Sequence, residues 1–380
     1  MIPLLLPLLA PAQAFPDCPY GVNAHNASDD QLALAADAGI HWVRLDVNWY
    51  QVEASEGSYD WSTLDRFVDT ADDLGLEVFA TVAYSPEWAV SGPCDDSAAD
   101  DAYWCHNRLP DEGAWTNFLS VLVARYGGRV KHWGLWNEPN LGGFFSGTRD
   151  EYVEHILIPG SDTIHGACSD CYVLGPELAN LRSADWDADE GVCAFDECIF
   201  NGWEVSLTEI LDDAGGYIDI VTHHKYSDSA EEMFDELLDG QWLYIQYMHG
   251  VKEITDAHAP GKPVWLTEYG FETSPGGDFT EAEAADELTE TYAILDEVGD
   301  GSWSESTNTP WPELEVLFWY DLVDDPNLSS DGEAYTWGLL ESDDTPKEAW
   351  YAMEDAVARY GGCVSSETDT DTDKIGRAHV

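Results

Sequence analysis

Two glutamates stand at the ends of short apolar and aromatic segments. Glu138 ends the sequence HWGLWNE, and Glu268 ends the sequence PVWLTE. The chain has 75 Asp and Glu residues, so any single glutamate could belong to the surface, but surface acids seldom have such apolar neighbours. Two facing carboxyl groups can cleave a glycosidic bond, one as the proton donor and the other as the nucleophile or base. The pair is therefore a candidate for glycoside chemistry.

Eight segments rich in strand-forming residues alternate with helical segments along the chain. We predict strands at 20–25, 42–48, 77–84, 130–137, 171–175, 217–223, 263–268 and 314–320. This alternation predicts an α/β fold with a parallel sheet, and eight units favour a single closed (β/α)8 TIM barrel over an open sheet. The carboxyl ends of barrel strands meet at one face, so the glutamates at the ends of the fourth and seventh strands should meet there. Long loops on the same face should occupy 85–114, 176–205 and 321–338.

The segments around the two glutamates resemble motifs of a known enzyme group. Residues 136–140, WNEPN, resemble the acid/base motif of clan A glycoside hydrolases; the full form is similar to family 39, and its NEP core is similar to family 5. Residues 265–270, WLTEYG, resemble the nucleophile strand of the same clan. The resemblance covers nearly all of residues 20–355. It implies a retaining β-glycosidase in which Glu138 is the acid/base and Glu268 is the nucleophile.

The same resemblance implies substrate-binding roles for further residues. Arg44 would hydrogen-bond the nucleophile and lower its pKa, and Asn137 would hold the sugar 2-hydroxyl. His224 and Tyr226 match a His-x-Tyr pair, in which the histidine lines the sugar subsite and the tyrosine contacts the nucleophile. Trp319 matches the tryptophan that forms the floor of the −1 subsite. A structural ion pair for Arg44 and a place in the core for Trp319 are the alternatives.

The segment after the third strand departs from the family 5 pattern. Family 5 enzymes often carry a histidine there, whereas this chain has Tyr84 and Trp88, which we expect to contact the substrate. The sugar, the linkage and the choice between internal and terminal cleavage stay open. The alternative function is a catalytically inactive carbohydrate-binding barrel on the cell surface. The presence of both glutamates and of Arg44 argues against this alternative.

Charge excludes other classes of partner. The chain has 15 Lys and Arg residues against 75 Asp and Glu residues, which gives a formal net charge of −60. Binding to nucleic acid through phosphates needs a basic surface, and docking on an anionic membrane needs one too. The 17 tryptophans are consistent with stacking on sugars as well as with core packing. We expect a monomer with a carbohydrate substrate and no cofactor.

The two ends of the chain differ from the middle. Residues 1–14 are apolar and end in Ala-Gln-Ala, which predicts a signal peptide that is too short to span a bilayer. The catalytic domain is expected at 15–363. Residues 364–373 form an acidic Thr/Asp-rich segment that predicts a disordered linker, and 374–380, KIGRAHV, resemble a non-native tail. The mature protein should be secreted or attached to the cell surface, with no membrane-spanning segment.

Eight cysteines fit an exported chain with disulfides. Proximity in the sequence favours the pairs Cys94–Cys105, Cys168–Cys171 and Cys193–Cys198, which leaves Cys18 with Cys363, although eight cysteines allow 105 pairings. A zinc site built from the four central cysteines is the alternative, but the second pair has a poor spacing for it. Asp185, Asp187 and Asp189 partly match a calcium-binding loop and form a weak calcium candidate. The alternative is an acidic loop held by the Cys193–Cys198 disulfide.

Overall fold

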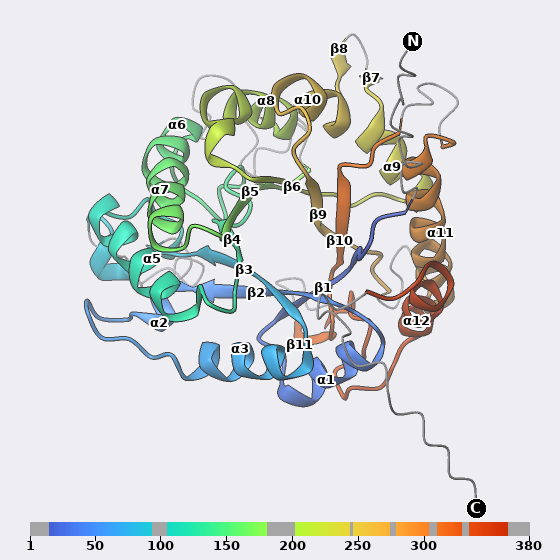
Figure 1. Ribbon diagram of the computed structural model, residues 1–380, viewed down its shortest axis with the longest axis horizontal. Coiled ribbons are helices and arrows are strands. Elements are labelled where there is room, and N and C mark those ends of the chain that lie inside the picture. Colours follow the sequence, from blue (N-terminus) through green and yellow to red (C-terminus); the bar gives the residue numbers. More distant parts are fainter. Residues whose placement is uncertain are drawn as a thin grey trace, which may run out of the picture.

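A closed barrel of eight parallel strands forms the centre of the molecule (Figure 1). The computed structural model describes residues 15–92, 105–180, 202–243, 246–273, 279–303, 310–328 and 334–363. In their order around the barrel the strands are β1 (Tyr20–His25), β10 (Leu314–Trp319), β9 (Val264–Tyr269), β6 (Ile220–His224), β5 (Tyr172–Leu178), β4 (His132–Leu135), β3 (Glu77–Ala83) and β2 (Trp42–Asn48). Each predicted strand is present, and the predicted (β/α)8 barrel is confirmed.

Helices cover the outside of the barrel between successive strands (Figure 1). The helices are α1 (Asp29–Asp37), α2 (Trp49–Val52), α3 (Ser62–Leu74), α5 (Glu112–Tyr126), α6 (Arg149–Tyr152), α7 (Ile158–Ala167), α8 (Trp203–Ala214), α9 (Ala230–Leu238), α10 (Val251–His258), α11 (Glu281–Asp300) and α12 (Glu348–Tyr360). Short 3-10 or π turns occupy η1 (Glu87–Ala89), η2 (Val153–Leu157) and η3 (Gly215–Tyr217).

The helix α3 shows how the sequence places a helix on the barrel. Leu64, Phe67, Val68 and Ala71 are buried, and their spacing of three and four residues puts them on one face. Gly75 ends the helix with a φ of 73°, a left-handed conformation that costs glycine little.

A compact aromatic and aliphatic cluster fills the inside of the barrel. It contains Phe79, Leu174, Ile220, Trp265, Val316 and Phe318. The rings of Phe79 and Phe318 lie 5.7 Å apart between centroids, although two other strands separate β3 from β10 along the sheet. Such contact across the barrel is possible only inside it. The interior is therefore packed, and a substrate has room only at its ends.

Two small hairpins and two disulfides complete the described structure. Strand β7 (Gln241–Leu243) pairs with β8 (Gln246–Met248), and β11 (Asp325–Leu328) pairs with β12 (Ala334–Tyr335) in the loop after β10. Disulfides join Cys18 to Cys363 and Cys168 to Cys171, so both of these predicted pairs are confirmed. With Cys168 and Cys171 oxidised, the zinc alternative loses two of its thiolates.

Several predictions concern residues outside the described ranges. They are the segment 1–14, the linker and tail at 364–380, the partner Cys94 of Cys105, the pair Cys193–Cys198, and the calcium candidates Asp185, Asp187 and Asp189. Within the described ranges, the helices are too short or too polar to cross a lipid bilayer.

Candidate active site

The two glutamates meet at the carboxyl ends of the barrel strands. Glu268 lies on β9, and Glu138 follows β4 by three residues. Their exposed fractions are only 7% and 9%. His224, at the end of β6, places its Nδ1 2.8 Å from Oε1 of Glu138 and 3.4 Å from Oε2 of Glu268. One oxygen of each carboxylate and one nitrogen of the imidazole thus lie within 4.8 Å of one another.

A tight turn aims Glu138 at this centre. Trp136 has a φ of 83° and Glu138 has a φ of 41°, values that are uncommon outside glycine. Hydrogen bonds hold the turn: the backbone N–H of Trp136 donates to the carbonyl of Val82 at 2.9 Å, and that of Glu138 donates to the carbonyl of Glu177 at 3.1 Å. The surrounding strands therefore fix a strained conformation, as is common at functional sites.

Arg44 links the nucleophile candidate to the barrel wall. This β2 side chain is 2% exposed, and its Nη1 donates to Oε1 of Glu268 at 2.7 Å and to Oδ1 of Asn23 at 2.7 Å. Its Nη2 donates to Oδ1 of Asn137 at 2.6 Å. The predicted contact between Arg44 and Glu268 is present, and the same cation orients the Asn137 amide.

Tyr226 contacts Glu268 on the other carboxylate oxygen. Its hydroxyl donates to Oε2 of Glu268 at 2.8 Å, as the His-x-Tyr resemblance implies. Its ring meets the edges of Tyr320 and Trp337, with centroids 6.3 and 5.1 Å apart. Glu268 is thus held by two donors, and both favour its charged form.

The surroundings change the pKa values of the two glutamates in opposite directions. Burial raises the pKa of Glu138, although its hydrogen bond with His224 opposes this change. Burial would also raise the pKa of Glu268, but the charges of His224 and Arg44 and the Tyr226 hydrogen bond outweigh it and lower the pKa. One carboxyl group can therefore carry a proton while the other is ionised, as acid and nucleophile must.

Sequence reasoning missed a third glutamate that is buried at this site. The predicted fifth strand stops at residue 175, whereas β5 continues to Leu178 and includes Glu177. The Glu177 carboxylate is fully buried and accepts hydrogen bonds from Nη2 of Arg44 at 2.7 Å and from the hydroxyl of Thr81 at 3.1 Å. The signal that selected Glu138 and Glu268, a glutamate in an apolar segment, is also present in YVLGPELA.

The two predicted residues after β3 have different surroundings. Tyr84 has a φ of 67°, and its hydroxyl accepts from Nδ2 of Asn137 at 3.4 Å, beside the glutamates. Trp88 donates from Nε1 to the carbonyl of Glu53 at 2.8 Å and lines a surface pocket with Asp111 at the start of α5. The structure brings Tyr84 to the centre and does not bring Trp88 there.

Trp319 is a correction to the predicted site. It is 1% exposed, its Nε1 donates to the carbonyl of Trp337 at 2.9 Å, and its ring packs on Tyr269 with centroids 5.5 Å apart. Such burial does not fit the floor of a sugar subsite. Side chains alternate along a strand, so with Phe318 inside the barrel, Trp319 points outward and Tyr320 is the next residue toward the mouth.

A second charged cluster lies next to Tyr320. The His25 ring meets Tyr320 edge-on at 5.4 Å, and its two nitrogens lie 2.6 Å from Oδ2 of Asp46 and 3.4 Å from Oδ2 of Asp321. Burial would lower the pKa of His25, but the charges on Asp321 and Asp46 raise it to about 10. His25, Tyr320, Asp321 and Trp337 line a cavity of about 130 Å³, which offers both charge and aromatic surface to a sugar.

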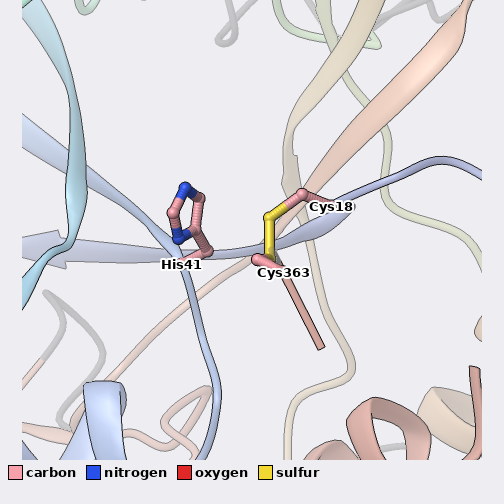
Figure 2. Close-up of side chains that lie close together, drawn as sticks. All are labelled: Cys18, His41 and Cys363. Carbon is pink, nitrogen blue, oxygen red and sulfur yellow. A yellow bond between two sulfur atoms is a disulfide. The ribbon is translucent and has the colours of Figure 1, made fainter. Parts of the chain in front are cut away.

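Potential metal ligands gather in three groups of described residues. In two groups the sulfurs belong to disulfides, as Figure 2 shows for Cys18 and Cys363 beside His41, and a disulfide sulfur is no thiolate ligand. The third group is Glu138, His224 and Glu268. Its carboxylates already bind Arg44, Tyr226 and His224, so the charge that a cation would supply is provided by side chains.

Comparison with known proteins shows both a family match and a common fold. The family model of Glycosyl hydrolases family 39 matches residues 16–287, a range that contains both glutamates. A β-xylosidase from Caldicellulosiruptor saccharolyticus is 24% identical over 236 residues, which are 57% of this chain and 42% of that protein. The match to a second β-xylosidase, from Geobacillus stearothermophilus, covers 50% of that protein. The chain therefore spans about half the length, or less, of these two relatives.

Solved structures share the barrel at low sequence identity. A family 39 β-xylosidase from Caulobacter crescentus has a TM-score of 0.59 and 19% identity, over 92% of this chain and 72% of that one. A GH5_18 protein from Streptomyces cattleya has a TM-score of 0.61 and 19% identity, over 94% of this chain and 83% of that one. At these identities the structural likeness shows the fold.

Proposed function

The chain belongs to glycosyl hydrolases family 39, and from this premise we propose that it hydrolyses β-linked glycans with retention of configuration. The observation that supports retention most strongly is the arrangement of Glu138, His224 and Glu268 within 4.8 Å. Retaining enzymes hold their carboxyl groups ~5–5.5 Å apart, whereas inverting enzymes need ~6.5–9.5 Å to admit a water molecule. One oxygen of each carboxylate thus lies closer to the other than the inverting range requires, which supports the proposal of retention.

In the first step Glu268 attacks the anomeric carbon and Glu138 gives its proton to the leaving oxygen. The lowered pKa of Glu268 keeps the nucleophile ionised, and the raised pKa of Glu138 keeps the acid protonated. The covalent bond between Glu268 and the sugar forms as the bond to the leaving oxygen breaks.

In the second step Glu138, now ionised, takes a proton from water, which attacks the same carbon and releases Glu268. Both displacements occur on one centre, so the product has the configuration of the substrate. Asn137 lies between Arg44 and Tyr84, and this fixed amide can hold the sugar 2-hydroxyl, where hydrogen bonds strengthen in the transition state.

We propose a neutral β-linked sugar of an oligo- or polysaccharide as the substrate, with a β-xyloside as the first candidate. The β-xylosidase names of two relatives support this choice. The cluster of His25, Asp46 and Asp321 beside the cavity supports it too, because carboxylates accept hydrogen bonds from hydroxyl groups and repel an acidic sugar. We also propose export, because disulfides such as Cys18–Cys363 persist in oxidising surroundings.

The test is hydrolysis of aryl β-xylosides, β-glucosides and β-mannosides, followed by NMR at early times. We expect cleavage of at least one of them, with the β-anomer as the first product. An α-anomer at early times would contradict retention. Binding of these sugars without turnover, by a protein with an intact site, would instead favour the inactive carbohydrate-binding barrel.

A further inference from the structure

Glu177 is a buried carboxylate that takes no part in the two displacement steps described above. Its Oε2 accepts two hydrogen bonds from Arg44, at 2.7 Å from Nη2 and at 3.1 Å from Nε. The hydroxyl of Thr81 lies 3.2 Å from Oε1 and accepts from Nε of Arg44 at 3.0 Å. These contacts place Glu177 behind Arg44, on the side away from Glu268.

Glu177 also lies behind the second cation of the site. Nε2 of His224 is 3.8 Å from Oε2 of Glu177, while Nδ1 of the same ring is 2.8 Å from Glu138. Arg44 and His224 are therefore each placed between Glu177 and one of the two glutamates proposed to react. A change at Glu177 reaches both of those glutamates through one intermediate side chain.

The fold leaves a specific space for this carboxylate. A Cβ atom added to Gly134, on β4, would lie 2.1 Å from Oε1 of Glu177, so glycine at 134 makes room for it. The backbone of Glu177 has a φ of 51°, and its N–H donates to the hydroxyl of Thr222 at 2.9 Å. Several strands thus combine to hold one charged group that cannot reach solvent.

We propose that Glu177 is a positioning residue for hydrolysis, whose charge holds Arg44 and His224 against the reacting glutamates and sets the pH range in which they work. The inference rests on the proposed function. The charge on a buried Arg needs a partner, and loss of one partner from a buried pair is costly. Glu268 is one such partner, but it becomes neutral when it bonds to the sugar. Glu177 then remains as the carboxylate that is hydrogen-bonded to Arg44 and keeps it in place.

The charged and titratable groups around Glu177 fix the direction of the expected change. They are Arg44 on β2, Glu138 after β4, Tyr152 on α6 and His224 on β6. Burial would lower the pKa of His224, but the charge of Glu268, the hydrogen bond with Glu138 and the nearby carboxylate of Glu177 raise it to about 9. Removing one buried negative charge makes the site bind every proton less tightly. All pKa values there should fall.

The experiment compares two variants with a matched control. Glu177→Gln keeps the shape and removes the charge, and Glu177→Asp keeps the charge and shortens the side chain. The control is Glu53→Gln, because Glu53 is equally buried but binds Trp49 and the backbone of Gly57, away from the reacting pair. Activity on an aryl β-glycoside is measured from pH 3 to pH 10, and folding is checked by thermal unfolding.

We expect Glu177→Gln to move both limbs of the kcat/KM profile to lower pH, by ~1 unit, which is the effect of one nearby charge. The maximum should fall by ~10²-fold, the loss that follows from a small misplacement of reacting groups. Glu177→Asp should keep the profile in place with a smaller loss, and Glu53→Gln should change neither. A Glu177→Gln profile that is lower but unshifted would overturn the proposal, because a merely structural role predicts that result.

A readout that needs no activity separates this inference from the proposed function. The pKa of His224 is followed by NMR of histidine-labelled protein, with His224→Gln used to assign its signal. It should fall by ~1 unit or more in Glu177→Gln and stay in Glu53→Gln. An unchanged His224 pKa overturns the inference even if the enzyme is active. An inactive wild-type protein in which the shift occurs contradicts the proposed function and leaves the electrostatic part of the inference supported.

Discussion

At the scale of single residues, the opposite pKa shifts of the two glutamates predict a bell-shaped pH profile. Glu268 has a lowered pKa, so activity should be lost only as pH falls through that low value and protonates the proposed nucleophile. Glu138 has a raised pKa, so activity should persist until pH rises through that value and removes the proton from the acid. The working range is therefore wider than two ordinary carboxyl groups would allow.

Replacing Tyr226 by Phe should narrow this range from the acidic side. Its hydroxyl donates to Glu268 at 2.8 Å and helps to lower the pKa of that carboxyl. Without this donor the pKa of Glu268 rises, and the acidic limb of kcat/KM should move to higher pH by ~1 unit. The control is Tyr59→Phe, since Tyr59 stacks on Trp61 outside the barrel. An acidic limb that does not move would contradict the role of Tyr226.

Substitution of the two glutamates should give different kinetic results. Glu268→Ala removes the proposed nucleophile and should abolish formation of a covalent intermediate. Glu138→Ala should lower the rate by ~10²–10⁴-fold, the range for general acid–base catalysis, but should spare the first step for aryl leaving groups that need no proton. Azide should restore its turnover and give the β-glycosyl azide. An α-glycosyl azide as the rescued product would contradict a mechanism that passes through a covalent intermediate and retains configuration.

At the scale of elements, β10 shows that a shift of one residue along a strand decides which aromatic side chain can contact the substrate. Phe318 lies in the inner cluster, Trp319 packs on Tyr269 and Phe271, and Tyr320 lies beside Tyr226. Adjacent residues of a strand face opposite sides, so the aromatic residue near the mouth is the one after Trp319. Tyr320 and Trp337, rather than Trp319, are the rings that can contact a sugar.

Alanine substitutions can separate these two neighbours. Trp319→Ala removes a fully buried ring and should lower the free energy of unfolding by ~3–5 kcal/mol, with a similar KM in the protein that remains folded. Tyr320→Ala removes a half-buried ring and should raise KM with a smaller loss of stability. Thermal unfolding and steady-state kinetics measure both effects. A raised KM with an unchanged free energy of unfolding in Trp319→Ala would instead support Trp319 as the floor of the −1 subsite.

The barrel and its two principal glutamates could be predicted because their signals are local. Each strand is a short apolar run, and the motifs WNEPN and WLTEYG contain their own glutamates. Glu177 was missed because Gly175 and Pro176 precede it, and this pair is typical of a strand end. The place of Trp319 could not be predicted, since the direction of a side chain near the end of a strand depends on how the barrel closes.

At the scale of the whole molecule, one disulfide joins the N-terminal and C-terminal segments of the barrel domain. Cys18 precedes β1 and Cys363 follows α12, at the end of the barrel opposite to Glu138 and Glu268. The double substitution Cys18→Ser and Cys363→Ser should lower the free energy of unfolding by ~2–5 kcal/mol. It should leave kcat and KM unchanged at temperatures where the protein stays folded. A change in KM at such temperatures would contradict the expectation that the disulfide acts on stability without affecting the site of Glu138 and Glu268.

The formal net charge of −60 should make the stability of the whole molecule depend on salt. Negative charges repel one another more in the compact state than in the extended chain, and this repulsion is screened over ~30 Å at 0.01 M salt but over ~8 Å at 0.15 M. The midpoint of thermal unfolding should therefore rise as sodium chloride is added over that range. Tetramethylammonium chloride at equal ionic strength is the control, because screening does not distinguish the two cations. A midpoint that falls with salt would contradict the argument, and a rise with sodium alone would indicate a specific cation site instead of screening.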